Sequence, residues 1–318
     1  MRSSQGSPGA RLAGLGGYRP AAALDNDELA ARFGKTAEWM HARTGMRART
    51  QATEEDTVVT MGAAAAADAL RNSQVDPEQV DLVIAASCTA ETPIPSVAAV
   101  VAGKLGIKSA GVFDLNSACA GFCYAIAVAA DLVRAGSART VLVVGSERMS
   151  TWIDKADLGT SIIFGDGAGA AVVTAAEQTG IGPVVWGGDG TGADLISIDP
   201  ADRHLRMQGQ KVFRWATTEI HPIALTACEQ AGVDPSELAA IVPHQANLRI
   251  VDAMAAKIGA EQAVVARDGV DTGNTSAASI PLALRKLLES GQVRSGELAL
   301  LVGFGAGLSY AAQVVRVP

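Results

Sequence analysis

Three residues of this chain carry side chains suited to acyl transfer, and each lies where an apolar run gives way to another segment. Cys119 follows the strand-like VFDLNSA and opens a helix-like stretch, where unpaired N–H groups of a first helical turn favour a thiolate. His244 lies in PHQANLRI after an apolar run, and Asn274 lies in GNTSAAS. A thiolate, an imidazole and an amide in such positions fit a site in which sulfur attacks a thioester.

Each of these residues also has a purely structural interpretation. A cysteine is often a buried and inert residue, a histidine at the end of a strand is often satisfied by hydrogen bonds, and an asparagine before a helix is often its N-cap. The three other cysteines, Cys88, Cys123 and Cys228, are expected to pack in the interior. The combination of the first three residues therefore weighs more than any one of them.

The elements that would position these residues occur twice along the chain. Residues 75–87 read VDPEQVDLVIAAS and residues 233–245 read VDPSELAAIVPHQ, at an offset of 158 positions. We predict two similar halves, residues 1–178 and residues 179–318. At the same offset, Ala277 stands where the first half has its nucleophilic candidate, so we expect one catalytic centre built from both halves.

Each half alternates short apolar runs with longer Ala-rich amphipathic stretches, which predicts a mixed α/β fold with helices covering the faces of a sheet. Two such units packed together would bury one layer of helices between two sheets. The predicted strands are residues 82–87, 112–115, 141–145, 162–164 and 168–174, and the predicted helices are residues 58–72, 96–105 and 119–135.

Composition excludes several classes of protein. The 318 residues contain 26 Lys+Arg and 33 Asp+Glu, a net charge of −7 that argues against nucleic acid as a partner. The longest uncharged run, residues 298–315, contains three glycines and predicts two strands around a turn rather than a membrane span. Four cysteines form neither a disulfide framework nor a zinc motif, and the N-terminus is not a signal peptide. We expect a soluble, cytoplasmic protein that binds no metal.

Five segments of the chain, DLNSACAGFCYAI, IIFGDGAGAAVV, VPHQANLRI, GNTSAAS and GFGAGLSYA, resemble the β-ketoacyl-[acyl-carrier-protein] synthase III family of the thiolase superfamily. The resemblance extends from about Gly14 to the C-terminus. It implies a thiolase-like fold, a five-layered αβαβα sandwich that assembles as a homodimer. This architecture agrees with the internal repeat, and the family requires neither a metal nor a cofactor.

The resemblance also implies a role for each candidate. Cys119 matches the nucleophile that takes a starter acyl group from acyl-CoA, and His244 and Asn274 match the pair that holds the malonyl carbonyl while CO2 leaves malonyl-ACP. Donors at the oxygen of the resulting enolate would stabilise it. The backbone N–H groups of Cys119 and Ala306 would hold the later tetrahedral oxyanion. The product, a β-ketoacyl-ACP, would initiate fatty acid or polyketide synthesis.

Further positions match the family's substrate path. The coenzyme A and pantetheine contacts implied by the resemblance are Trp39, Arg43, Met207, Gly209, Phe213 and Asn247. One departure concerns Leu158, which stands where the family often has an arginine that stacks on adenine. Leucine cannot make this contact, so the choice between CoA and ACP as acyl donor stays open.

The acyl carrier protein is acidic, and basic residues near the tunnel would guide its docking. The positions that match are Arg214, Arg249 and Lys257, together with Lys211. Ile94, in the segment ETPIPS, matches a dimer-interface residue that caps the partner's acyl pocket. It stands where a phenylalanine can occur, which favours a roomier pocket for a branched or longer starter.

The same residues also favour or disfavour other functions known for this fold. A thiolase would have a second cysteine in the GFGAG turn, and a dual-histidine condensing enzyme would have histidine near position 274. A plant-type polyketide synthase is usually longer. A pathway-specific priming synthase, or an acyltransferase that forms no carbon–carbon bond, stays open. A non-catalytic partner subunit would be expected to lack Cys119.

Overall fold

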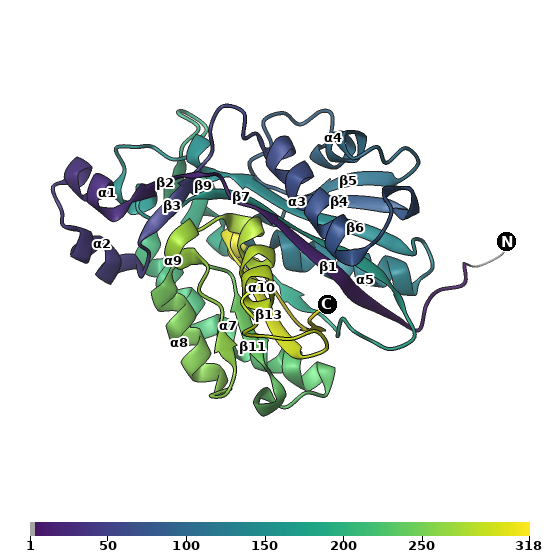
Figure 1. The fold of residues 1–318 in the computed structure, drawn as a ribbon. Coiled ribbons are helices and arrows are strands. Elements are labelled where there is room, and N and C mark those ends of the chain that lie inside the picture. Colours follow the sequence, from purple (N-terminus) through teal and green to yellow (C-terminus); the bar gives the residue numbers. More distant parts are fainter. Residues whose placement is uncertain (1–3) are drawn as a thin grey trace.

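A computed structural model describes residues 4–318, and in it two five-stranded sheets with matching topology form the framework (Figure 1). In sheet order, the first contains β1 (Gly9–Tyr18), β7 (Asp166–Ala176), β6 (Thr140–Arg148), β4 (Leu82–Ala86) and β5 (Gly111–Leu115). The second contains β8 (Val185–Gly187), β14 (Tyr310–Arg316), β13 (Leu298–Phe304), β11 (Ala240–Pro243) and β12 (Val264–Val265). In both sheets the first three strands are antiparallel neighbours and the last three are parallel ones.

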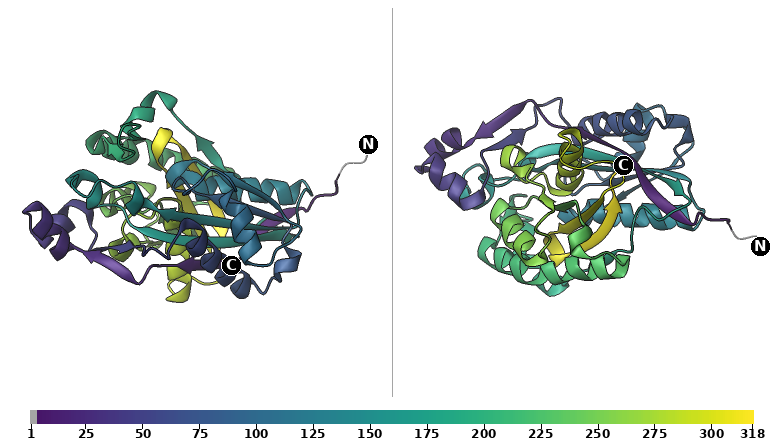
Figure 2. Two further views of the ribbon diagram at one scale, coloured as in Figure 1. Left: turned by 90° about the horizontal axis from the view of Figure 1, so that it is seen from above. Right: turned by 60° about the horizontal axis from the view of Figure 1, so that its bottom comes forward.

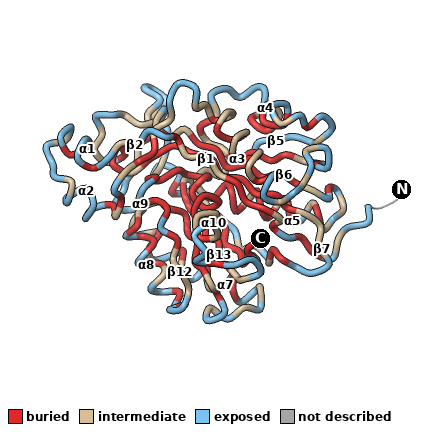
Figure 3. Tube along the Cα trace, in the orientation of Figure 1, coloured by how far each residue is buried: buried red, intermediate tan, exposed pale blue. Residues whose placement is uncertain are grey.

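Helices cover both sheets and also lie between them. The outer helices of the first sheet are α3 (Val58–Ser73) and α4 (Val97–Lys104), the central ones are α5 (Gly121–Arg134) and α10 (Ser279–Glu289), and those outside the second sheet are α7 (Gly209–Ala231) and α8 (Leu248–Ile258). The most deeply buried chain lies in the sheets and the central helices (Figure 3). The order helix, sheet, helix, sheet, helix confirms the predicted five-layered α/β sandwich.

The repeat is visible in local hydrogen bonds as well as in topology. Asp76 and Gln79 form a reciprocal cap around one 3-10 turn, and Asp234 and Glu237 form the same cap in the second half. These positions keep the sequence offset of 158. The boundary between residues 178 and 179 stays a prediction.

Shorter elements complete the chain. They are β2 (Ala22–Asp25), α1 (Asn26–Phe33), α2 (Ala37–Thr44), β3 (Ala48–Gln51), α6 (Leu158–Ser161), β9 (Ile196–Ile198), β10 (Leu205–Met207) and α9 (Gly269–Thr272). There are also 3-10 turns at Pro77–Gln79, Ala118–Ala120, Met149–Thr151, Gly190–Leu195, Pro235–Glu237, Ser276–Ala278 and Ala306–Leu308. Helices α1 and α2 project at the end of the molecule opposite the N-terminus (Figure 2).

The predicted strand at 162–164 is wrong. The segment follows α6 as a turn, and Phe164 makes only an isolated bridge to Asn274, because three apolar residues can pack against a core without joining a sheet.

The uncharged run at 298–315 does form two strands, β13 and β14, as expected. Within residues 4–318, no helix is both long and apolar enough to cross a membrane.

Candidate active site

A cavity of about 960 Å³ opens at the carboxyl ends of parallel strands from both sheets. Cys119 follows β5, His244 follows β11 and Ala306 follows β13, while Asn274 precedes the 3-10 turn that leads into α10. All four residues line this cavity. The topology thus brings together four residues that the sequence places in two separate halves.

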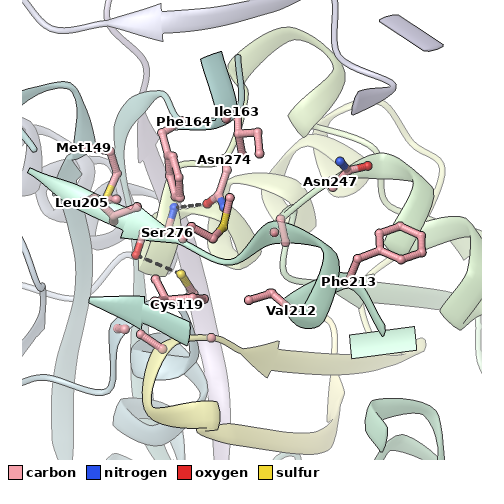
Figure 4. Close-up of a pocket in the computed structure, with 18 of the residues that line it drawn as sticks. Cys119, Met149, Ile163, Phe164, Leu205, Val212, Phe213, Asn247, Asn274 and Ser276 are labelled. Carbon is pink, nitrogen blue, oxygen red and sulfur yellow. Dashed lines mark hydrogen bonds between the residues drawn. The ribbon is translucent and has the colours of Figure 1, made fainter. Parts of the chain in front are cut away.

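Cys119 lies in the 3-10 turn before α5, and its sulfur meets a serine from the other half of the chain. The Ser276 Oγ lies 3.5 Å from the Cys119 Sγ (Figure 4). Burial, together with the nearby carboxylate of Glu147, raises the pKa of Cys119 to about 12, although the hydrogen bond with Ser276 lowers it. Desolvation thus outweighs the effect of the helix start and favours the protonated thiol, in contrast to the thiolate that the sequence predicts.

His244 is buried and neutral. Burial lowers the pKa of its imidazole to about 3. Its Nδ1 lies 2.7 Å from the Ser279 Oγ, which also accepts a longer hydrogen bond (3.4 Å) from the Gln245 N–H. In the tautomer in which the Ser279 hydroxyl donates to Nδ1, the ring proton lies on Nε2. The imidazole can then donate through Nε2.

The orientation of the Asn274 amide is fixed by the main chain. Its Oδ1 accepts a hydrogen bond of 2.8 Å from the backbone N–H of Ser276. Because the oxygen occupies this position, the amide presents its NH2 group as the remaining donor. His244 and Asn274 therefore supply two neutral N–H donors to one cavity, as stabilisation of an enolate oxygen requires.

The glycine-rich turn after β13 packs against the nucleophile. A Cβ built on Gly305 would lie 2.8 Å from the Cys119 Cβ and 3.2 Å from its Sγ. Only glycine permits this approach, since real Cβ atoms do not come so close to other atoms. The turn places Ala306 beside Cys119 along the cavity wall.

The residues predicted to contact CoA and pantetheine all line the same cavity, namely Trp39, Arg43, Met207, Gly209, Phe213 and Asn247. Figure 4 shows Phe213 and Asn247 on one side of Cys119, and Met149 and Leu205 on the other. The amide of Asn247 is engaged at both ends, because Oδ1 accepts from the Arg249 N–H and Nδ2 donates to the Arg43 carbonyl. Asn247 therefore caps α8 and ties it to α2.

The basic residues and Ile94 occupy different places. Arg214 and Arg249 line the cavity, and the Arg249 guanidinium lies 5.4 Å from the Phe213 ring centre. Lys257 lies outside the cavity and donates to the Thr217 carbonyl at 2.6 Å. Ile94 is 84% exposed and does not line the cavity of its own chain. The docking and pocket roles of these residues stay predictions.

Four residues that the sequence analysis did not assign to the site also belong to it. Ser276 contacts Cys119, Ser279 contacts His244, and Glu147 is a fully buried carboxylate that accepts a hydrogen bond from Ser276. Cys88, expected to be a packing residue, lines the cavity and contacts Glu147 through its thiol at 3.3 Å. The sequence contained an indication that Cys88 and Glu147 belong to the site, because both lie at or just beyond the carboxyl ends of strands parallel to β5.

Comparison with known proteins identifies the family. Residues 113–190 match the model described as 3-oxoacyl-[acyl-carrier-protein (ACP)] synthase III, and residues 228–317 match that of its C-terminal part. The chain is 50% identical to β-ketoacyl-[acyl-carrier-protein] synthase III 4 of Streptomyces coelicolor over 313 residues, which cover 98% of this chain and 99% of the relative. The chain belongs to the 3-oxoacyl-[acyl-carrier-protein] synthase III family. It is therefore a condensing acyltransferase.

Other known enzymes are similar to this chain in sequence or in structure. The β-ketoacyl-[acyl-carrier-protein] synthase III of Mycobacteroides abscessus is 44% identical, with 96% of this chain and 94% of the relative covered. The priming β-ketosynthase from the R1128 polyketide pathway is 46% identical with a TM-score of 0.97, and covers 100% of this chain and 98% of its own. The Aquifex aeolicus enzyme is 37% identical with a TM-score of 0.92, over 97% and 100% of the two chains.

Proposed function

We propose that this synthase III catalyses a decarboxylative Claisen condensation. An acyl group moves from acyl-CoA to Cys119, and the enolate formed from malonyl-ACP then attacks the acyl-Cys119 carbonyl to give β-ketoacyl-ACP. The observation that carries the proposal is the convergence on one cavity of a cysteine with two neutral donors, His244 and Asn274. In the proposed chemistry, these donors stabilise the enolate oxygen after CO2 leaves.

Two ends of the cavity suit two parts of an acyl thioester. Met149, Phe164 and Leu205 form a buried apolar cluster on one side of Cys119, which suits the acyl chain (Figure 4). Trp39 and Arg43 stand at the other end on α2, and an aromatic face with a cation suits a nucleotide phosphate. We assign the CoA moiety and, in the second half-reaction, the ACP arm to this end.

The experiment that tests the function is intact-mass spectrometry of the protein after incubation with a panel of acyl-CoAs and acyl-ACPs. We expect a single acyl adduct on the wild-type protein and no adduct on the Cys119→Ala variant. Because Leu158 lines the cavity and cannot stack as arginine does, both donor classes belong in the panel. The absence of an adduct with every donor would overturn the proposal.

A pathway-specific priming ketosynthase is the second candidate, favoured by the likeness to the R1128 enzyme. The two candidates differ in the starter that they accept and in the pathway that they feed. The panel measures the first of these differences, the starter that the protein accepts.

We also propose a homodimer joined along β5. This edge strand leaves Val112 39% and Phe113 37% exposed, and Ile94 lies 84% exposed on the loop after β4. Unpaired edge strands with apolar side chains are ready to pair with a second copy. We expect sedimentation equilibrium to give twice the chain mass, and a Phe113→Lys variant to shift it toward the monomer. A monomeric wild-type protein would contradict the proposal.

A further inference from the structure

A buried carboxylate lies beside the nucleophile and has no part in the chemistry described so far. Glu147, near the end of β6, is fully buried. It accepts hydrogen bonds from the Thr89 hydroxyl (2.5 Å), the Ser87 hydroxyl (3.2 Å), the Cys88 N–H (3.1 Å) and the Ser276 hydroxyl (3.0 Å), and its Oε1 lies 3.3 Å from the Cys88 thiol. A buried charge is costly, so these donors stabilise an ionised form of Glu147.

The charge of Glu147 is not neutralised by a basic side chain. No arginine, lysine or histidine forms an ion pair with it anywhere in residues 4–318. Arg148, the next residue, donates to the Thr53 carbonyl at 2.9 Å. The titratable groups in contact with Glu147 or one hydroxyl away are the thiols of Cys88 and Cys119. Burial raises the pKa of Glu147, so the carboxylate has a raised affinity for a proton.

The Ser276 hydroxyl joins the nucleophile to this carboxylate. Its Oγ is 3.5 Å from the Cys119 Sγ and 3.0 Å from the Glu147 Oε1. One hydroxyl can accept from the thiol and donate to the carboxylate at the same time. Ser276 adopts a left-handed φ of 50°, and its N–H is held by the Asn274 Oδ1, so its position is fixed by the turn.

We propose that Ser276 passes the proton of Cys119 to Glu147 as the sulfur attacks the acyl thioester, an inference that rests on the proposed role of Cys119. The S–H bond breaks, Ser276 Oγ takes that proton, and the hydroxyl proton moves to Glu147 Oε1. The sulfur bonds to the acyl carbon, the bond from that carbon to the leaving sulfur breaks, and the leaving thiolate takes the proton back from Glu147. Ser276 touches the reacting atom, and Glu147 acts through it as a positioning residue.

His244 is a poorer acceptor for this proton. Its Nδ1 is occupied by Ser279, and its burial strongly disfavours a charged imidazolium. Transfer to Glu147 moves one negative charge from a carboxylate to a sulfur without changing the total charge of the cluster. In a desolvated site, this exchange avoids the creation of a new pair of charges.

The relay predicts a distinctive pH profile for Cys119. While the cysteine and the carboxylate share one proton, the fraction present as thiolate with carboxylic acid does not change with pH. The relay requires this shared-proton form to exceed the form in which both groups are ionised, so alkylation of Cys119 by iodoacetamide should change by less than about twofold between pH 6.5 and pH 8. A thiol that ionises alone becomes about tenfold more reactive per pH unit, or about 30-fold over this interval.

The test measures this profile by peptide mass spectrometry that reports Cys119 alone. We expect a flat profile for the wild-type protein and a rise of about 30-fold for Glu147→Gln and for Ser276→Ala, as for a thiol that ionises alone. Asp166→Asn is the matched control, because Asp166 is another fully buried carboxylate whose oxygens accept from the Ala52 and Ser150 N–H groups. Its profile should stay flat.

A flat profile in Glu147→Gln or Ser276→Ala, or a steep one in the wild-type protein, would overturn the relay. If Glu147→Gln does not fold, Ser276→Ala carries the test, with thermal unfolding as the check on both. Because iodoacetamide needs no acyl donor, failure of the relay is distinct from failure of the proposed function. The latter appears as the absence of an acyl adduct on a protein whose Cys119 still reacts with iodoacetamide.

Discussion

Replacing Gly305 by alanine is expected to lower the rate of Cys119 acylation by about 10²-fold, the loss typical of a reacting group displaced by about 1 Å. The new Cβ would lie 2.8 Å from the Cys119 Cβ, 3.1 Å from its N and 3.2 Å from its Sγ, so the nucleophile or the turn must move. Gly305 has an extended φ of 179°, which alanine also adopts. The effect therefore comes from the contact rather than from backbone strain.

Single-turnover acylation and iodoacetamide labelling of Cys119 would measure this loss. Gly103→Ala is the control, because Gly103 lies in α4 with no atom within 4 Å of an added Cβ. Alanine there should leave acylation unchanged and stabilise the helix by about 0.5–1 kcal/mol. Acylation of Gly305→Ala at the wild-type rate would contradict the close packing of the GFGAG turn on Cys119.

The layers of the fold could be predicted from the sequence because each half repeats the same signals. The turn at Asp76 and the turn at Asp234 carry the same reciprocal cap, and local hydrogen bonds of this kind depend on residues three apart. The alternation of apolar runs and amphipathic stretches then fixes the α/β class. The sequence does not decide the structure of residues 162–164, because only three-dimensional packing determines whether so short a segment joins a sheet.

The catalytic candidates could be predicted from residue types and positions, and their roles from the resemblance, but their surroundings could not. Ser276 and Glu147 are 129 residues apart, and no local pattern indicates that they meet. The protonation of Cys119 was predicted wrongly for the same reason, since the helix start is visible in the sequence while the burial that raises its pKa is a property of both halves together. The sequence predicts that Cys119 lies at the start of a helix, but the desolvation that raises its pKa depends on the assembled fold.

The duplicated turn shows how one local structure acquired two uses. Ala118 (φ 45°) and Ser276 (φ 50°) are both left-handed, and each donates its N–H to the side chain of an asparagine two residues earlier, Asn116 or Asn274. In the first half, the next residue is the nucleophile. In the second half, the left-handed residue itself carries the hydroxyl that contacts this nucleophile. The repeat thus places two equivalent turns next to each other, one carrying the nucleophilic thiol and the other carrying the hydroxyl that contacts it.

Replacing His244 by alanine is expected to lower the rate of condensation by about 10²–10³-fold, the usual cost of removing one donor from an oxyanion site. Acylation of Cys119 should be retained, because its proton passes to Glu147 in the proposed relay. Asn274→Ala should lower condensation to a similar degree, with a double variant less than additive. It should also slow acylation, because it removes the Oδ1 that holds the Ser276 N–H. Release of CO2 from malonyl-ACP and mass spectrometry of the acyl adduct measure the two steps separately.

The pH dependence of condensation sharpens this prediction. His244 is a neutral imidazole above its pKa of about 3, and this form is lost only as the pH falls through that value. Protonation of His244 should therefore cause no loss of activity between about pH 5 and pH 8, unlike that of an exposed histidine with a pKa of about 6.5. If His244→Ala lost acylation as well as decarboxylation, the assignment of His244 to condensation alone would be contradicted. The imidazole would then serve as the base for the Cys119 thiol, and the proton path through Ser276 would not be needed.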